Sequence, residues 1–151
     1  MNNTILTNLQ NSTESGDVLY YLGDLTFKEV VAKEFFKSFS NLEIHYIIGN
    51  HDNPKVLKIA NKYCKSVSNL RDIEIEGISI TLCHYAMRVW NKSHFNAWQL
   101  YGHSHGTLTP SGKQCDVGVD SNSFKPVSFE SLKSIMTEMP NNFNFIPPEK
   151  R

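Results

Sequence analysis

Four apolar segments of this chain share one ending, in which a small residue is followed by Asp, Asn or His. In chain order the endings are Gly23-Asp24, Gly49-Asn50-His51-Asp52, Cys83-His84-Tyr85 and Gly102-His103-Ser104-His105-Gly106. Short continuous apolar runs are typical of buried strands. In open α/β sheets, ligands gather beyond the carboxyl ends of the strands. The pattern therefore predicts one sheet edge that collects Asp24, Asn50, His51, His84, His103 and His105.

The segments between these strands carry helix patterns, which predicts an α/β fold. Thr26 and Glu29 form a capping-box signature, so a helix is expected over about residues 27–39. Pro54 suits the first turn of another helix, and residues 73–82 alternate as a hairpin does. The remaining expected elements are an amphipathic start over 1–15, a loop or short helix over 87–96, a last strand over 116–119 and a helix over 126–139. This order favours a layered fold over a helical bundle or a pure sandwich.

The chain of 151 residues is long enough for one domain with its own core. We expect a single domain over residues 1–139 and a flexible C-terminal tail over the proline-rich residues 140–151. Fifteen basic and fifteen acidic residues balance to zero net charge, which argues against a long nucleic acid as partner. No apolar run approaches the roughly 20 residues of a membrane span. Three widely separated cysteines fit a reducing cytoplasm.

Asp, Asn and His side chains at one sheet edge are ligand types that borderline divalent cations prefer. Mn²⁺, Fe²⁺ and Zn²⁺ accept such ligands, whereas a structural zinc site usually recruits thiolates. Two such ions about 3.5–4 Å apart activate water and clamp the oxygens of a phosphoryl displacement. Single motifs have plainer interpretations, because Gly23-Asp24 alone is a common turn and His84 alone could be a core histidine. The Gly-Asn-His-Asp and Gly-His-Ser-His-Gly motifs are more specific, and all four together favour a metal site.

These four motifs resemble those of the calcineurin-like metallophosphoesterase superfamily, in particular its small bacterial and phage members. The resemblance runs from about Val18 to Met136, which is nearly the whole chain. It implies a four-layer α/β/β/α sandwich with a two-metal centre at the strand ends. It also implies a hydrolase that acts on a small phosphomonoester or phosphodiester and uses Mn²⁺, with Zn²⁺ or Fe²⁺ as alternatives.

The resemblance further implies a role for each polar residue. The expected metal ligands are Asp24, which bridges both ions, Asn50, His84 and His103 on the second ion, and His105 on the first. His51 is expected to be the general acid near the leaving oxygen, steadied by Asp52. Arg88 is a candidate for pairing with substrate phosphate, with a solvated surface charge as the alternative.

The chain departs from this family at its start. The family opens with a strand carrying Asp-x-His, which supplies two ligands to the first ion, and no such motif precedes Asp24. We therefore expect a domain without its first strand, a first ion held only by Asp24 and His105, and an uncovered sheet edge beside Val18–Leu22 that promotes self-association. Two functions remain open: a metal-dependent phosphoesterase, or a non-catalytic metal- or phosphate-binding remnant, such as one part of a split enzyme.

Overall fold

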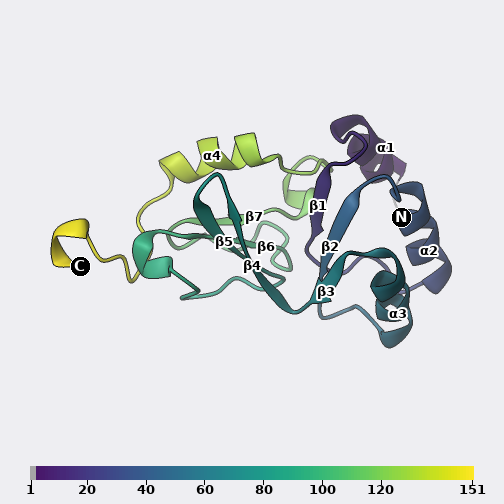
Figure 1. Cartoon of the computed structure of the whole chain (residues 1–151), viewed down its shortest axis with the longest axis horizontal. Coiled ribbons are helices and arrows are strands. Elements are labelled where there is room, and N and C mark those ends of the chain that lie inside the picture. Colours follow the sequence, from purple (N-terminus) through teal and green to yellow (C-terminus); the bar gives the residue numbers. More distant parts are fainter. Residues whose placement is uncertain (1–2) are drawn as a thin grey trace.

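The computed structural model describes residues 3–151 and shows a mixed α/β fold with two sheets (Figure 1). The first sheet is parallel, with the order β1 (Val18–Tyr21), β2 (Glu43–Ile47) and β3 (Ser66–Ser68). The second sheet has the order β4 (Leu70–Ile75), β5 (Ile78–Cys83), β6 (Trp98–Tyr101) and β7 (Gln114–Asp116). It is mixed, because β4 and β5 form the expected antiparallel hairpin while β6 and β7 add in parallel.

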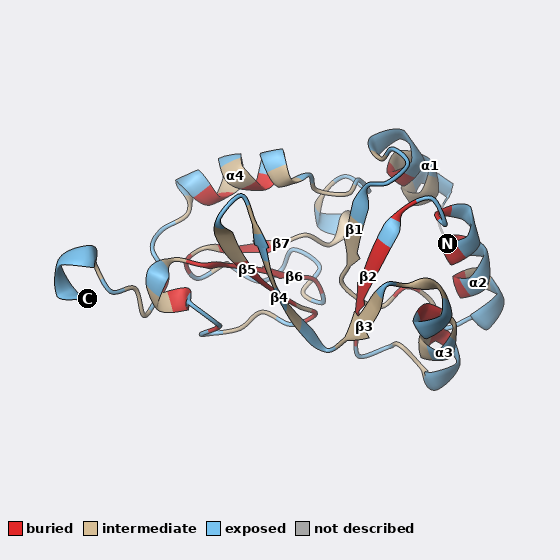
Figure 2. Cartoon of the chain, in the orientation of Figure 1, coloured by how far each residue is buried: buried red, intermediate tan, exposed pale blue. Residues whose placement is uncertain are grey.

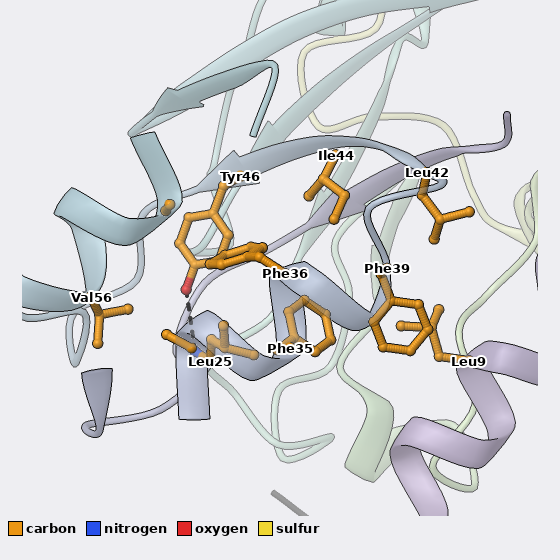
Figure 3. Close-up of a cluster of buried hydrophobic side chains, with 11 residues drawn as sticks. Leu9, Leu25, Phe35, Phe36, Phe39, Leu42, Ile44, Tyr46 and Val56 are labelled. Atoms are coloured by element: carbon orange, nitrogen blue, oxygen red, sulfur yellow. Dashed lines mark hydrogen bonds between the residues drawn. The ribbon is translucent and has the colours of Figure 1, made fainter. Parts of the chain in front are cut away.

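Three helices cover one face of the first sheet (Figure 1): α1 (Asn3–Ser12), α2 (Glu29–Ser38) and α3 (Pro54–Tyr63). Their apolar sides meet Ile44 and Tyr46 of β2 in one core, in which Phe36, Tyr46 and Val56 are fully buried (Figure 3). Burying a side chain of this size stabilises the fold by roughly 1.5–3 kcal/mol. This core fixes β2, whose carboxyl end carries Asn50 and His51.

A second core joins the two sheets to the last helix, α4 (Phe129–Glu138). Leu132 and Met136 of α4 pack with the apolar face of β5 and β6, which Figure 2 shows as mainly buried. Ile47 of β2 belongs to the same cluster, so the second face of the first sheet is tied to the second sheet. No helix in residues 3–151 is long and apolar enough to cross a membrane.

Some expected boundaries differ from the observed ones for local reasons. The capping box at Thr26 does not form, because Thr26 Oγ1 accepts from the Lys28 amide while α2 begins at Glu29 with Lys28 as its N-cap. The last strand covers Gln114–Asp116 instead of 116–119, since the chain turns after Asp116 into a short 3₁₀ helix at Val119–Ser121. β1 is only half-buried, because it lies at the edge of its sheet.

The segment after Pro140 contacts the rest of the fold at several residues, of which Asn142 is the buried one. Asn142 is buried, and its side-chain nitrogen donates to the carbonyls of Ser93 and Ala97 at 2.8 and 2.9 Å. Its side-chain oxygen accepts from the Lys113 amide. Further along, the Ile146 amide donates to the His94 carbonyl at 2.9 Å, and a short 3₁₀ helix follows at Pro148–Lys150 (Figure 1).

Candidate metal centre

The loops that follow β1, β5 and β6 bring Asp24, His84 and His103 together. One ligand atom of each of these residues lies within 4.8 Å of the others. Asn50, in the loop after β2, joins them, because its Oδ1 lies 2.9 Å from His84 Nε2 and 2.9 Å from His103 Nδ1. Four residues that the sequence places at separate strand ends thus meet at one point, as the rule for α/β sheets predicts.

His84 shows why a cation suits this point. The ring is buried, and its Nδ1 donates to the Leu22 carbonyl at 2.7 Å. In the neutral ring Nδ1 holds the only proton, so Nε2 presents a lone pair. That lone pair faces two further acceptors, Asn50 Oδ1 at 2.9 Å and Asp24 Oδ2 at 3.1 Å. With Nδ1 as the protonated nitrogen of a neutral ring, these three atoms are all electron-pair donors, which is a set that fits a divalent cation, and a backbone carbonyl is one of the common partners for the far nitrogen of a ligating histidine.

The backbone at this centre is unusual in conformation. Asp24, His103 and His105 all have positive φ, at 57°, 61° and 49°. Asp and His adopt this left-handed region more readily than most residues, yet it costs on the order of 1–3 kcal/mol each time. Gly23 has φ of 85°, and a Cβ there would lie 2.5 Å from the Gly49 amide nitrogen. Such clustered strain is typical of sites where geometry serves function.

Asp52 holds the loops of the centre and does not steady the His51 ring as expected. Its Oδ2 accepts from the amides of Asp24 and Gly49 at 3.1 and 2.8 Å, and its Oδ1 accepts from the Tyr46 hydroxyl at 2.7 Å. Burial and the Asp52 carboxylate both raise the pKa of Tyr46, so the phenol stays protonated and keeps donating. Among the described residues, the hydrogen bonds of Asp52 therefore lead to backbone and to Tyr46.

His51 lies beside the centre without joining the ligand group. Its backbone amide donates to Asp24 Oδ1 at 2.8 Å, which fixes the residue next to the carboxylate. Its exposed ring makes an edge-to-face contact with the Phe27 ring, with 5.5 Å between ring centroids. The Phe27 side chain is itself 69% exposed, so an aromatic rim borders the centre at this point.

Two aspartates that the sequence motifs did not single out, Asp120 and Asp116, hold His105 and the glycine after it. The Nδ1 of His105 is hydrogen-bonded to the carboxylate of Asp120, and this bond raises the pKa of His105, with the charges of Asp120, Asp116 and Asp24 acting in the same direction. Asp116 accepts from the Gly106 amide, directly after His105. The sequence does contain a signal for these two residues, which is a pair of aspartates around a glycine, Asp116-Val117-Gly118-Val119-Asp120. The apolar residues between them favoured a strand, so the pair was not identified as a site.

Arg88 is placed elsewhere. Its guanidinium stacks on the Phe143 ring, 4.1 Å from the ring centroid, so its described contact is with the C-terminal segment. Arg88 itself is exposed, and its pairing with substrate phosphate stays a prediction.

Comparison with known proteins supports the fold class. No protein-family model matches the chain. An uncharacterized protein of Methanocaldococcus jannaschii is 29% identical over 145 residues, which cover 90% of this chain and 75% of that protein. A protein of unknown function from Aquifex aeolicus has a similar structure, with a TM-score of 0.68 at 23% identity over 88% of this chain and 83% of the other. A novel archaeal phosphodiesterase has a TM-score of 0.52 at 18% identity over 77% and 76%. The two likenesses show a shared α/β fold.

Proposed function

We propose that this protein is a metal-dependent phosphoesterase, a hydrolase that cleaves a phosphomonoester or phosphodiester at a two-metal centre. The strongest support is the convergence of Asp24, Asn50, His84 and His103, whose electron-pair donors face one another at hydrogen-bond distance. The likeness of fold to an archaeal phosphodiesterase agrees with it. We extend the proposal to the architecture, a calcineurin-like α/β/β/α sandwich with α1–α3 and α4 as its outer layers.

The chain's own residues have distinct parts in this chemistry. Asp24, Asn50, His84 and His103 would hold a divalent cation, which we propose to be Mn²⁺, with Zn²⁺ or Fe²⁺ as alternatives. A bound cation of this kind lowers the pKa of water and neutralises charge on phosphoryl oxygens. The Leu22 carbonyl holds the His84 proton on Nδ1 and thereby keeps Nε2 as the donor atom.

His51 is the proposed general acid. The hydrogen bond from its backbone amide to the Asp24 carboxylate holds it beside the proposed cation ligands, while its ring is exposed and free to approach a substrate. A positioned imidazole can donate a proton to a leaving alkoxide and so remove the need to expel a strong base. Phe27 borders this ring, so an apolar or aromatic leaving group can pack there. With zero net charge on the chain, we propose a small phosphate ester as substrate.

The test combines metal binding with turnover. Mn²⁺ is titrated into the metal-free chain by calorimetry, and hydrolysis of 4-nitrophenyl phosphate and bis(4-nitrophenyl) phosphate is measured in Mn²⁺. We expect His84→Gln to lose both Mn²⁺ binding and hydrolysis. The matched control is His45→Gln, because His45 is equally buried but bonds Ser66 and Glu43 away from the centre. It should lower stability and leave Mn²⁺ binding in place.

Two outcomes would go against the phosphoesterase. If the wild-type chain binds Mn²⁺ but hydrolyses neither ester, the alternative of a non-catalytic metal- or phosphate-binding protein is favoured. If His84→Gln and His45→Gln change Mn²⁺ binding equally, the four convergent residues are not the binding site.

A further inference from the structure

We propose, on the basis of the proposed function, that Asp120 positions His105 for the metal centre. Its carboxylate accepts from the Nδ1 of the ring and leaves Nε2 as the atom available to a cation. Asp120 lies 15 residues beyond His105, in the short 3₁₀ helix Val119–Ser121 that follows β7. Carboxylate–histidine pairs of this kind fix the orientation and tautomer of ligating histidines at many metal sites. Asp120 is thus a positioning residue that belongs to none of the four motifs.

Asp116 joins the loop that carries His105 to the loop that carries Asp120. Asp116 Oδ2 accepts from the Gly106 amide at 3.0 Å, and its Oδ1 accepts from the Gly118 amide at 2.9 Å. Because Gly106 follows His105 directly, Asp116 fixes the backbone of His105 while Asp120 fixes the ring. A Cβ on Gly118 would lie 2.9 Å from Asp120 Oδ1 and 3.0 Å from Asp116 Oδ1. Glycine at this position therefore lets both carboxylates approach.

The exposure of His105 explains why a partner is needed. Its side chain is 75% exposed, whereas the His84 ring is buried and oriented by the Leu22 carbonyl. An exposed ring without a partner samples several rotamers and both neutral tautomers, and ordering it on binding costs conformational entropy. The Asp120 carboxylate gives His105 the hydrogen-bond acceptor for Nδ1 that the Leu22 carbonyl gives His84.

The direct test is the tautomer of His105 in the metal-free chain. Long-range ¹H–¹⁵N NMR correlations at alkaline pH, where the ring is neutral, distinguish Nδ1–H from Nε2–H. We expect the Nδ1–H form in the wild type. Asp120→Ala removes the acceptor, so the ring should change to the Nε2–H form that an unpaired imidazole prefers in water. Asp120→Asn keeps an acceptor oxygen and should retain Nδ1–H.

Mn²⁺ affinity is the second readout. Removing the partner of a ligating histidine typically weakens metal binding about 10–100-fold. In calorimetric titrations we expect this loss for Asp120→Ala at the ion that His105 would hold, and a smaller loss for Asp120→Asn. Glu138→Ala removes an exposed carboxylate from the end of α4 and should change neither the tautomer nor the affinity.

The outcomes separate this proposal from the proposed function. An Nε2–H ring in the wild type, or a tautomer that Asp120→Ala leaves unchanged, overturns the role of Asp120 alone. Equal loss of Mn²⁺ from Asp120→Asn and Asp120→Ala also overturns it, because Asp120 would then be a ligand itself. A wild-type chain that binds no Mn²⁺ overturns the proposed function, and with it any metal role for Asp120, whatever the tautomer shows.

Discussion

Replacing Gly49 with alanine should dismantle the candidate metal centre without removing any ligand. A Cβ at Gly49 would lie 2.2 Å from Asp24 Oδ1 and 2.7 Å from the Asp24 amide nitrogen. Real Cβ atoms essentially never come within 3.0 Å of such neighbours. The Asp24 carboxylate therefore has to move by about 0.8 Å or more, since close-packed atoms do not overlap. Ligand distances in metal sites lie within about 0.2 Å of their ideal values, so a shift of this size disturbs the ligand set.

The size of the effect follows from the contacts of Asp24. Moving the carboxylate breaks its 2.8 Å hydrogen bond from the His51 amide, and a bond to a charged group contributes roughly 1.5–3 kcal/mol. We expect urea unfolding of Gly49→Ala to show a loss of this size. If the displaced ligand costs about 2 kcal/mol in cation binding, Mn²⁺ affinity falls about 30-fold, because 1.4 kcal/mol corresponds to tenfold. Calorimetric titration with Mn²⁺ measures this change.

Gly102→Ala is the matched control, because it adds the same methyl group at the same centre. A Cβ there would lie 3.6 Å from the Leu22 carbonyl oxygen and 3.9 Å from His84 Nδ1, which are ordinary contacts. This variant should bind Mn²⁺ and unfold nearly as the wild type does. The reasoning fails if Gly49→Ala binds Mn²⁺ with unchanged affinity, or if Gly102→Ala is damaged to the same degree.

Three further perturbations have definite expected results. His51→Gln should keep Mn²⁺ binding yet slow hydrolysis of alkyl phosphate esters on the order of 10²–10⁴-fold, with a mild effect on nitrophenyl esters, and loss of Mn²⁺ would contradict the general-acid role. Because β1 is an edge strand and the Val18 side chain is half exposed, the chain should self-associate, and Val18→Lys should reduce this in light scattering; a monomeric wild type would contradict it. Burial raises the pKa of Cys64 to about 12 and of Tyr101 to about 12, so both favour the fold while protonated. The contribution of these two groups to the free energy of unfolding should therefore be complete below about pH 9 and fall as the pH rises toward 12. Urea unfolding midpoints at several pH values measure this change.

The strand-end motifs predicted six residues at one edge, and four of them meet in the structure. Parallel pairing brings the ends of β1 and β2 together in one sheet and the ends of β5 and β6 together in the other. The two pairs of ends meet because the sheets pack against each other through a shared core. The partners of those residues were not predictable in the same way. The bond from Asp120 to His105 depends on a turn after Asp116, and the contact of Arg88 with Phe143 depends on how Asn142 anchors the C-terminal segment. These are long-range contacts with no periodic signal in the sequence.

Two aspartates, Asp52 and Asp116, show how the strained centre is held. Asp52 accepts from the Gly49 amide in its own loop and from the Asp24 amide in a neighbouring loop. Asp116 accepts from the Gly118 amide in its own loop and from the Gly106 amide beside His105. Each carboxylate thus joins two loops by bonds to backbone, at a point where a proposed ligand has positive φ. Bonds to charged acceptors contribute roughly 1.5–3 kcal/mol, which is comparable to the cost on the order of 1–3 kcal/mol of each left-handed residue. The loops can therefore hold converging acceptor atoms before a cation arrives, and a cation that binds only the folded chain stabilises it further, by about 2.7 kcal/mol at a hundred times its dissociation constant.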